Sequence, residues 1–201
     1  MTDFRLAALF VFSYLAGGIP TGYLVVKRFY GYDIRTRGSG NPGTANVYRN
    51  AGALPGAVTL FVDALKGFAP VHLGLLLYPG RPLLAVGLGV AAIFGHNWTP
   101  FLGFKGGKGV ATSAGVFAAL LPLPMLVTVG AFLLAVKLSG HISVGSMTGA
   151  IALPVAAAGL GSPLPFTAAA AGAGALILLK HVSNIKRLLD NREHGIHGTS
   201  A

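Results

Sequence analysis

Long apolar segments recur along almost the whole chain and restrict it to a protein that spans a membrane. The first, from Phe4 to Val26, is long enough to cross about 30 Å of hydrocarbon at about 1.5 Å per residue. Hydrophobic residues make up 53% of the 201 positions and charged residues only 10%, which is not the composition of a soluble fold of this size. We therefore predict an all-α integral membrane protein without β-sheet, formed by one domain over 1–201.

Breaks between the apolar segments predict seven transmembrane helices. After the first span we expect Ala53–Tyr78, Leu83–Trp98, two short helices within Val110–Lys137, Ser143–Leu160 and Pro165–Lys180. The division of the fourth segment rests on Leu121-Pro122-Leu123-Pro124, since proline ends helices. Lys27 and Arg28 follow the first span rather than precede it, which places the N-terminus outside and, after seven spans, the C-terminus inside.

The distribution of basic residues supports this count. Of 15 lysines and arginines, Arg5 and Arg81 fall outside, Lys66 falls within the second span, and the other 12 fall in the inner loops and tail. A single span over 110–137 would send Lys137 and the basic tail outside. The net charge of +10 thus follows the topology, and without a basic helix or aromatic-interleaved patch no nucleic-acid partner is expected.

Four polar tracts converge on the inner side of this topology, at 38–49, 95–112, 137–146 and 181–194. The first reads GSGNPGTANVYR, where glycine and proline exclude an ordinary helix and leave backbone N–H groups able to form an anion-binding nest. The second contains Lys105-Gly106-Gly107-Lys108-Gly109, which offers backbone donors and lysines to an anion without a metal. A shared phosphate site is expected.

Two formal motif matches fail in context. The segment 38–43 matches G-x-G-x-x-G, but no strand precedes it and the acid that follows, Asp63, lies inside an apolar helix. The segment 105–109 lacks the first glycine of a Walker loop, and Gly109 stands where Ser or Thr would bind magnesium. The chain contains no cysteine, which excludes disulfides and the common Cys-based zinc sites.

Two features leave alternatives open. Asp63 and Lys66 are ionisable residues within a span and share a helix face at i,i+3 spacing; they form either a mutually neutralised pair or part of a catalytic site. His96 is either an interfacial histidine bonded to a nearby carbonyl or a general base.

At these tracts the sequence resembles the bacterial acyl-phosphate:glycerol-3-phosphate acyltransferase family, the PlsY type. The resemblance covers nearly the whole chain and rests on five segments in order, which are GSGNPGTANVYR, FVDALKGFAPV, GHNWTPFLGFKGGKGVATSAGV, SVGS and HVSNIKRLL. The sequence departs from the family at Thr44-Ala45-Asn46, where Ala-Thr-Asn is more usual, and at 190–193, where a Gly-Thr-Glu ending is commoner.

The resemblance implies transfer of a fatty acyl group from acyl phosphate to the 1-hydroxyl of glycerol-3-phosphate, giving lysophosphatidate and inorganic phosphate. This reaction of phospholipid synthesis would take place at the bacterial inner membrane, on its cytoplasmic side. Acyl phosphate is already activated, so positioning and charge stabilisation suffice. No metal, cofactor or obligate protein partner is expected, and the partners are the two substrates and membrane lipid.

The same resemblance, read with the chemistry of the residues, assigns roles. Arg49 would bind the phosphate of glycerol-3-phosphate bidentately, Lys108 would offset developing charge, and Ser146 would help to orient the glycerol. Catalytic candidates are Ser39, His96, Lys108, His181 and Asn184. Substrate-binding candidates are Gly38, Gly40, Asn41, Gly43, Asn46, Arg49, Lys105, Gly106, Gly107, Ser143, Ser146 and Glu193.

A transporter or channel for an organic phosphate anion is the alternative from another class, since short spans with glycine-rich breaks also describe such proteins. The chain has no internal repeat, and its polar tracts lie on one side rather than at mid-membrane. Both observations favour the enzyme.

Overall fold

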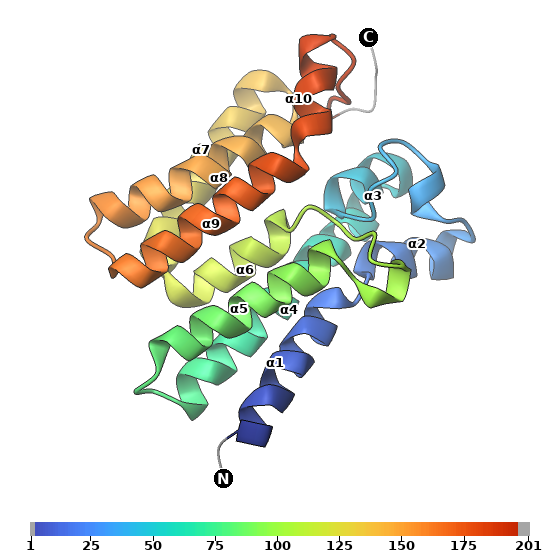
Figure 1. Ribbon diagram of the computed structural model, residues 1–201. Helices are drawn as coiled ribbons and strands as arrows, with labels where there is room; N and C mark the ends of the chain where they lie inside the picture. Colours follow the sequence, from blue (N-terminus) through green and yellow to red (C-terminus); the bar gives the residue numbers. More distant parts are fainter. Residues whose placement is uncertain (1–2, 197–201) are drawn as a thin grey trace. The chain divides into compact units, whose positions relative to one another are not determined.

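The computed structural model describes residues 3–196, and every regular element in that range is helical (Figure 1). The predicted absence of β-sheet is confirmed for this part of the chain. The α-helices are α1 (Asp3–Gly18), α2 (Thr21–Tyr30), α3 (Thr44–Ala51), α4 (Ala53–Leu77), α5 (Pro82–Asn97), α6 (Val110–Leu120), α7 (Pro122–Ser139), α8 (Ile142–Gly159), α9 (Leu164–Lys180) and α10 (Val182–Leu189). Two short 3₁₀ turns, η1 (Ile34–Thr36) and η2 (Pro100–Leu102), lie in the loops.

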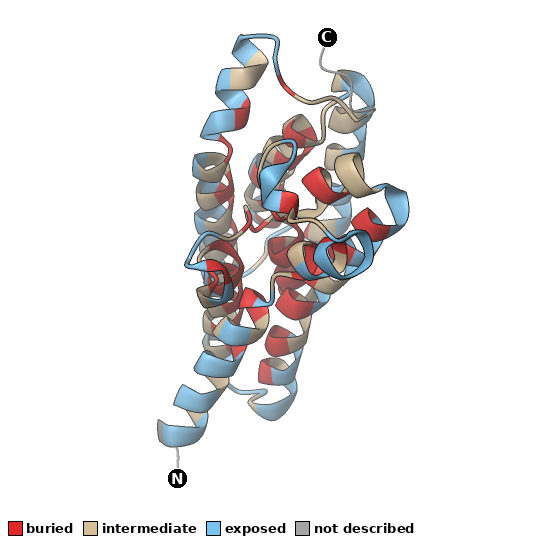
Figure 2. Ribbon diagram, turned by 90° about the vertical axis from the view of Figure 1, so that its right-hand side faces the viewer, coloured by how far each residue is buried: buried red, intermediate tan, exposed pale blue. Residues whose placement is uncertain are grey.

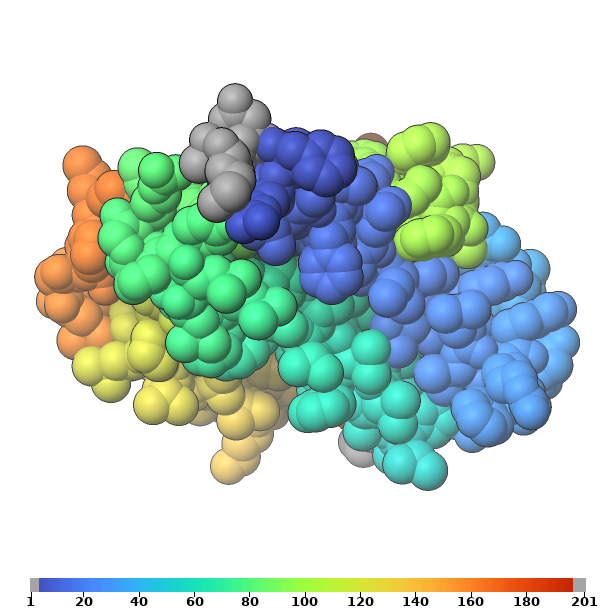
Figure 3. Space-filling view, turned by 90° about the horizontal axis from the view of Figure 1, so that it is seen from below, coloured from blue at the N-terminus to red at the C-terminus, as the bar shows by residue number. Residues whose placement is uncertain are grey.

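The helices form two compact units, Met1–Leu120 and Leu121–Ala201, called here the N-terminal and C-terminal units. In the N-terminal unit α1 packs along α5 (Figures 1 and 3). Helix α4 packs against both α5 and α6. In the C-terminal unit α8 packs between α7 and α9, and α10 continues from α9.

Small residues let the helices of the N-terminal unit approach closely. A Cβ on Gly17 would overlap the backbone of Ala92 where α1 meets α5, and a Cβ on Gly67 would overlap the backbone of Thr112 where α4 meets α6. Such small-residue contacts are typical of helices packed in a membrane, where close backbone approach stabilises the pair.

Three described helices are long and apolar enough to cross a membrane, namely α4, α7 and α8, and two bent pairs of helices bring the number to as many as five. Their large apolar side chains are often exposed, as in α7, where Leu126 and Leu138 are 69% and 78% exposed. Figure 2 shows such exposed residues beside buried ones on the same helices. Apolar outer faces of this kind suit contact with lipid.

The segment predicted as the first span, Phe4–Val26, is divided into two helices. The chain bends by 43° between α1 and α2, because Pro20 lies between them and has no N–H to continue the helix. Helix α2 then runs past Val26 to Tyr30 and ends at Gly31, whose φ is +76°. The predicted break at Leu121-Pro122 is confirmed, since α6 ends at Leu120 and Pro122 is the first residue of α7.

Candidate active site

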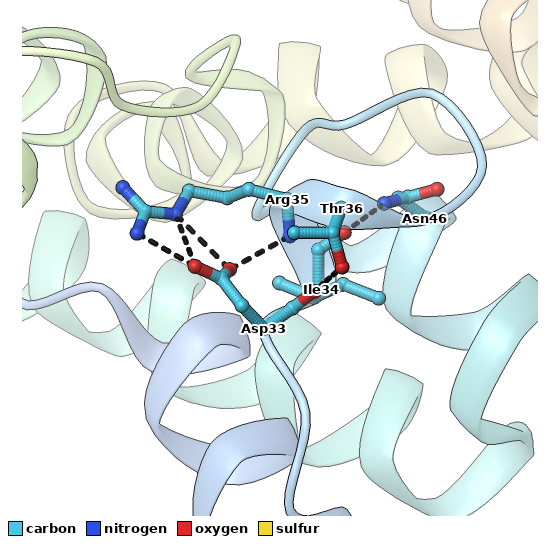
Figure 4. Close-up of polar contacts among 5 residues, drawn as sticks. All are labelled: Asp33, Ile34, Arg35, Thr36 and Asn46. Atoms are coloured by element: carbon cyan, nitrogen blue, oxygen red, sulfur yellow. Dashed lines mark hydrogen bonds and ion pairs between the residues drawn. The ribbon is translucent and has the colours of Figure 1, made fainter.

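The first polar tract folds around the buried side chain of Asn46, which is 1% exposed. Its Nδ2 donates to the Ile34 carbonyl at 3.2 Å (Figure 4) and to the Arg37 carbonyl at 3.0 Å. Its Oδ1 accepts from the Ser39 N–H at 3.0 Å. Asn50 Nδ2 also donates to this Oδ1, at 3.0 Å. The amide therefore uses its full hydrogen-bonding capacity within the protein. Asn46 therefore holds the loop in shape, and its predicted part in binding substrate stays a prediction.

Glycines and an asparagine turn the chain between η1 and α3. Gly38 and Gly40 have φ of +54° and +69°, a backbone conformation that side chains disfavour. Asn41 Oδ1 accepts from the Gly43 N–H at 2.9 Å, immediately before α3. The glycine-rich half of the tract is thus irregular, as predicted. Its second half forms α3, whose first-turn N–H groups can meet an anion.

The two arginines before this loop are held by aromatic rings. Arg35 lies 5.0 Å from the ring centre of Tyr23, and Arg37 lies 4.2 Å from that of Tyr32. Arg35 also pairs with Asp33 at 2.7 Å (Figure 4). The hydrogen bond from the Arg35 side chain keeps the pKa of Asp33 below its usual value. The positive charges of Arg35 and Arg37 are therefore fixed beside the glycine-rich segment.

The second polar tract packs back on the end of α5. The Gly106 N–H donates to the Asn97 carbonyl at 3.3 Å, and the Gly107 N–H donates to the His96 carbonyl at 3.0 Å. A Cβ on Gly107 would overlap His96 Nε2, so the imidazole lies directly against the loop. Gly109, with φ of +80°, then turns the chain into α6. Half-buried Lys108 is held just before the N-terminus of that helix.

Behind this loop, Asp63 and Lys66 form the predicted i,i+3 ion pair, with Lys66 Nζ 2.7 Å from Asp63 Oδ1. Lys66 Nζ also donates to the Ile19 carbonyl at 2.7 Å. His96 Nδ1 lies 3.9 Å from Asp63 Oδ2. Pro42 of the first tract and Gly106 and Gly107 of the second line one small cavity with these three side chains. The two tracts thus converge within the N-terminal unit.

In the C-terminal unit the predicted residue Asn184 and a neighbour on α10, Arg187, hydrogen-bond Glu193. Asn184 Nδ2 donates to Glu193 Oε1 at 2.5 Å, and Arg187 Nε donates to Oε2 at 2.7 Å. Burial opposes ionisation of Glu193, but the hydrogen bonds from Asn184 and Arg187 outweigh it, and the pKa of Glu193 lies below its usual value. Glu193 therefore holds Asn184 in place, and its predicted part in binding substrate stays a prediction.

His181 and Asn184 lie at the junction of α9 and α10, where the Asn184 N–H donates to the His181 carbonyl at 2.9 Å. Both side chains are buried. His181 Nδ1 lies 2.8 Å from the Ile177 carbonyl, which can only accept, so Nδ1 carries a proton. Ser146 Oγ donates to the Ile142 carbonyl at 2.9 Å on α8.

Comparison with known proteins identifies the family of the chain. Residues 7–191 match the model of a family described as glycerol-3-phosphate acyltransferase. Glycerol-3-phosphate acyltransferase 2 of Moorella thermoacetica is 45% identical, over 92% of this chain and 94% of that protein. The chain belongs to the glycerol-3-phosphate acyltransferase family. A second member, from Endomicrobium trichonymphae, is 41% identical over 92% of each chain.

A solved member of this acyltransferase family has the same fold. The crystal structure of PlsY, an integral membrane glycerol 3-phosphate acyltransferase, in its glycerol 3-phosphate form matches with a TM-score of 0.89 and 36% identity, over 95% of each chain. Its lysophosphatidic acid form matches with a TM-score of 0.87. The protein is thus an integral membrane acyltransferase, and the transporter alternative is not favoured.

Some residues that shape the acyltransferase site were missed by sequence reasoning. Asn50 binds Asn46 from the next turn of α3, and Arg187 binds Glu193 from α10. Helical spacing could have found both, since Asn50 follows Asn46 by four positions and Arg187 follows Asn184 by three. The predicted convergence of all four polar tracts stays a prediction.

Proposed function

We propose that this acyltransferase moves a fatty acyl group from acyl phosphate to the 1-hydroxyl of glycerol-3-phosphate, releasing lysophosphatidate and inorganic phosphate. One observation carries the proposal: Pro42 of one glycine-rich loop and Gly106 and Gly107 of another line the same cavity beside His96. Both loops offer cations and backbone N–H groups, which suit phosphate. The glycerol 3-phosphate and lysophosphatidic acid forms of PlsY correspond to the acceptor and the product of this reaction.

In the N-terminal unit the first tract binds both substrates and the second stabilises developing charge. Ser39, with the backbone of Gly38, Gly40, Asn41 and Gly43, holds the acyl phosphate. Arg49 grips the glycerol phosphate bidentately. Lys108, supported by Lys105, Gly106 and Gly107, offsets charge that develops on the oxyanion and the leaving phosphate. His96 beside this loop is the candidate proton acceptor.

In the C-terminal unit the side chains around Glu193 orient the acceptor. His181 Nε2 and the Asn184 amide hydrogen-bond the glycerol hydroxyls, and Ser143 and Ser146 complete this polar surface. The reaction needs no covalent nucleophile and no metal, because acyl phosphate is an activated mixed anhydride and alignment supplies most of the rate. The whole chain, 1–201, acts as a single domain.

We infer seven membrane spans, formed by α1 and α4 to α9, with the N-terminus outside and the active site on the cytoplasmic face of a bacterial inner membrane. The positive-inside rule supports this orientation. In sealed cells, cysteine in place of exposed Lys105 should react only with reagents that enter the cytoplasm, and cysteine in place of Gly80 should react from outside. Two other suitable labelling positions, Thr2 and Ser200, lie outside the described residues. Labelling of position 105 from outside would refute the topology.

Purified protein in detergent tests the reaction directly. Phosphate release should require both acyl phosphate and glycerol-3-phosphate, and lysophosphatidate should form in equal amount. Strong preference for acyl-coenzyme A over acyl phosphate would assign the protein to another donor class and overturn this part of the proposal.

A further inference from the structure

An open groove of about 690 Å³ lies between the start of α1 and the end of α4 in the N-terminal unit. Its lining includes Arg5, Ala8, Leu9 and Phe12 of α1, with Leu77 and Tyr78 from the end of α4. The start of α1 and the turn between α4 and α5 lie at the same end of this unit (Figure 1). Gly18, at the other end of α1, lines the small cavity of the candidate active site. The helix rises by about 20 Å between Arg5 and Gly18, so the groove is separate from that site.

One face of α1 forms the apolar wall of this groove. Arg5, Ala8, Leu9 and Phe12 follow one another at i, i+3, i+4 and i+7 spacing, which places them on the same side of the helix. Phe12 is 56% exposed, and Leu77 across the groove is 60% exposed. Helix α4 is long and apolar enough to cross a membrane, and α1 belongs to a bent pair that is. The wall therefore offers a lipid acyl chain a surface about 10 Å long.

Polar groups lie at the outer end of the groove. Arg5 lies in the first turn of α1, and Tyr78 follows the last residue of α4. Within residues 3–196, neither the Arg5 guanidinium nor the Tyr78 hydroxyl has a hydrogen bond or an ion pair. A guanidinium binds phosphate through two parallel N–H donors, and a tyrosine hydroxyl can donate a further hydrogen bond. A long basic side chain near the end of a membrane helix reaches the headgroup level.

We propose that this groove binds a phospholipid of net negative charge, with an acyl chain along Ala8, Leu9 and Phe12 and its phosphate on Arg5 and Tyr78. Among the described residues that line the groove, Arg5 is the only charged one. A zwitterionic headgroup would bring an ammonium group beside this arginine without a carboxylate to receive it, which disfavours such a lipid. Free phosphate lacks the chain that the apolar wall accommodates. The site is independent of the acyl transfer proposed above.

Native mass spectrometry of the purified full chain in detergent tests this site, because it resolves each bound lipid. One phosphatidylglycerol should bind more tightly than further copies and more tightly than phosphatidylcholine, and inorganic phosphate should not displace it. Arg5→Gln removes the charge but keeps a long side chain, and should weaken binding of the first phosphatidylglycerol by about tenfold. Ala8→Trp fills the groove without changing the charge and should weaken it as well.

Each variant has a matched control at an exposed position outside the groove lining. Arg81→Gln removes an arginine from the turn between α4 and α5, and Ala7→Trp adds the same ring one position earlier on α1. Neither control should change the affinity for phosphatidylglycerol. Arg5 and Ala8 are also exposed, so all four variants should melt within a few degrees of the parent protein in lipid-free detergent. If Ala8→Trp melts lower, the comparison of Arg5→Gln with Arg81→Gln decides.

Three results would overturn the proposal. The first is phosphatidylglycerol affinity in Arg5→Gln within twofold of the parent protein, or an equal loss in Arg81→Gln. The second is equal affinity of the parent protein for phosphatidylcholine. The third is a dimer of the parent protein that Ala8→Trp separates, because the groove would then join two copies of the chain.

Discussion

Asn46 offers the sharpest test of how the first loop is built, because its donor and acceptor halves can be removed separately. Asn46→Asp keeps the shape and the bond from the Ser39 N–H but removes both donors. The Ile34 and Arg37 carbonyls, now 3.2 and 3.0 Å from an amide nitrogen, would face a carboxylate oxygen instead. A buried group left unsatisfied costs about 1–3 kcal/mol, so two cost about 2–6 kcal/mol.

This loss should appear first in catalysis, because Asn46 ties the loop that presents Ser39 to the start of α3. We expect Asn46→Asp to lower kcat/KM for glycerol-3-phosphate by tenfold or more, since about 1.4 kcal/mol corresponds to a factor of ten. Asn50→Ala is the matched control. It removes only the half-buried bonds to the Asn46 carbonyl and Oδ1, and should cost about 1 kcal/mol per bond.

The assay is phosphate release at varied glycerol-3-phosphate, with the melting temperature in detergent measured for each variant. If Asn46→Asp retains kcat/KM within twofold of the parent protein, or if Asn50→Ala is the more damaging change, the buried amide does not organise the loop and the reasoning is wrong.

Three further predictions follow from the site. Arg49→Lys should mainly raise KM for glycerol-3-phosphate, whereas Lys108→Ala should lower kcat by about 10²–10³ because its partner charge develops only during transfer; Lys186→Ala, an exposed lysine, should change neither. The pKa of Glu193 is lowered in the folded protein, so the stability that its carboxylate contributes is complete above the unfolded pKa, near 4.5. This stability is lost as the pH falls through the lower folded pKa. Melting temperatures measured from pH 7 downward should therefore fall more steeply in the parent protein than in Glu193→Gln. Activity should be unchanged in EDTA, and a loss that magnesium restores would reveal a metal site.

Local chemistry explains which features could be predicted from the sequence. The all-helical fold class can be predicted from apolar runs of membrane length. The end of α6 and the start of α7 can be predicted from Pro122. Each of these features depends only on residues that are neighbours in the sequence. The pairing of Asp63 with Lys66 is likewise a property of helical spacing. The positions of the four polar tracts could also be predicted, because polar residues and glycines stand out in an apolar chain.

The roles within those tracts depend on contacts between residues distant in sequence. Asn46 and Glu193 carry the same residue types as substrate ligands, yet each has its hydrogen bonds taken by protein groups that folding brings to it. Only the tertiary structure shows that the bend at Pro20 places the Ile19 carbonyl on Lys66, and that Gly107 rests on His96. A side chain can bind substrate or hold the fold with the same atoms, and its partners in space decide which.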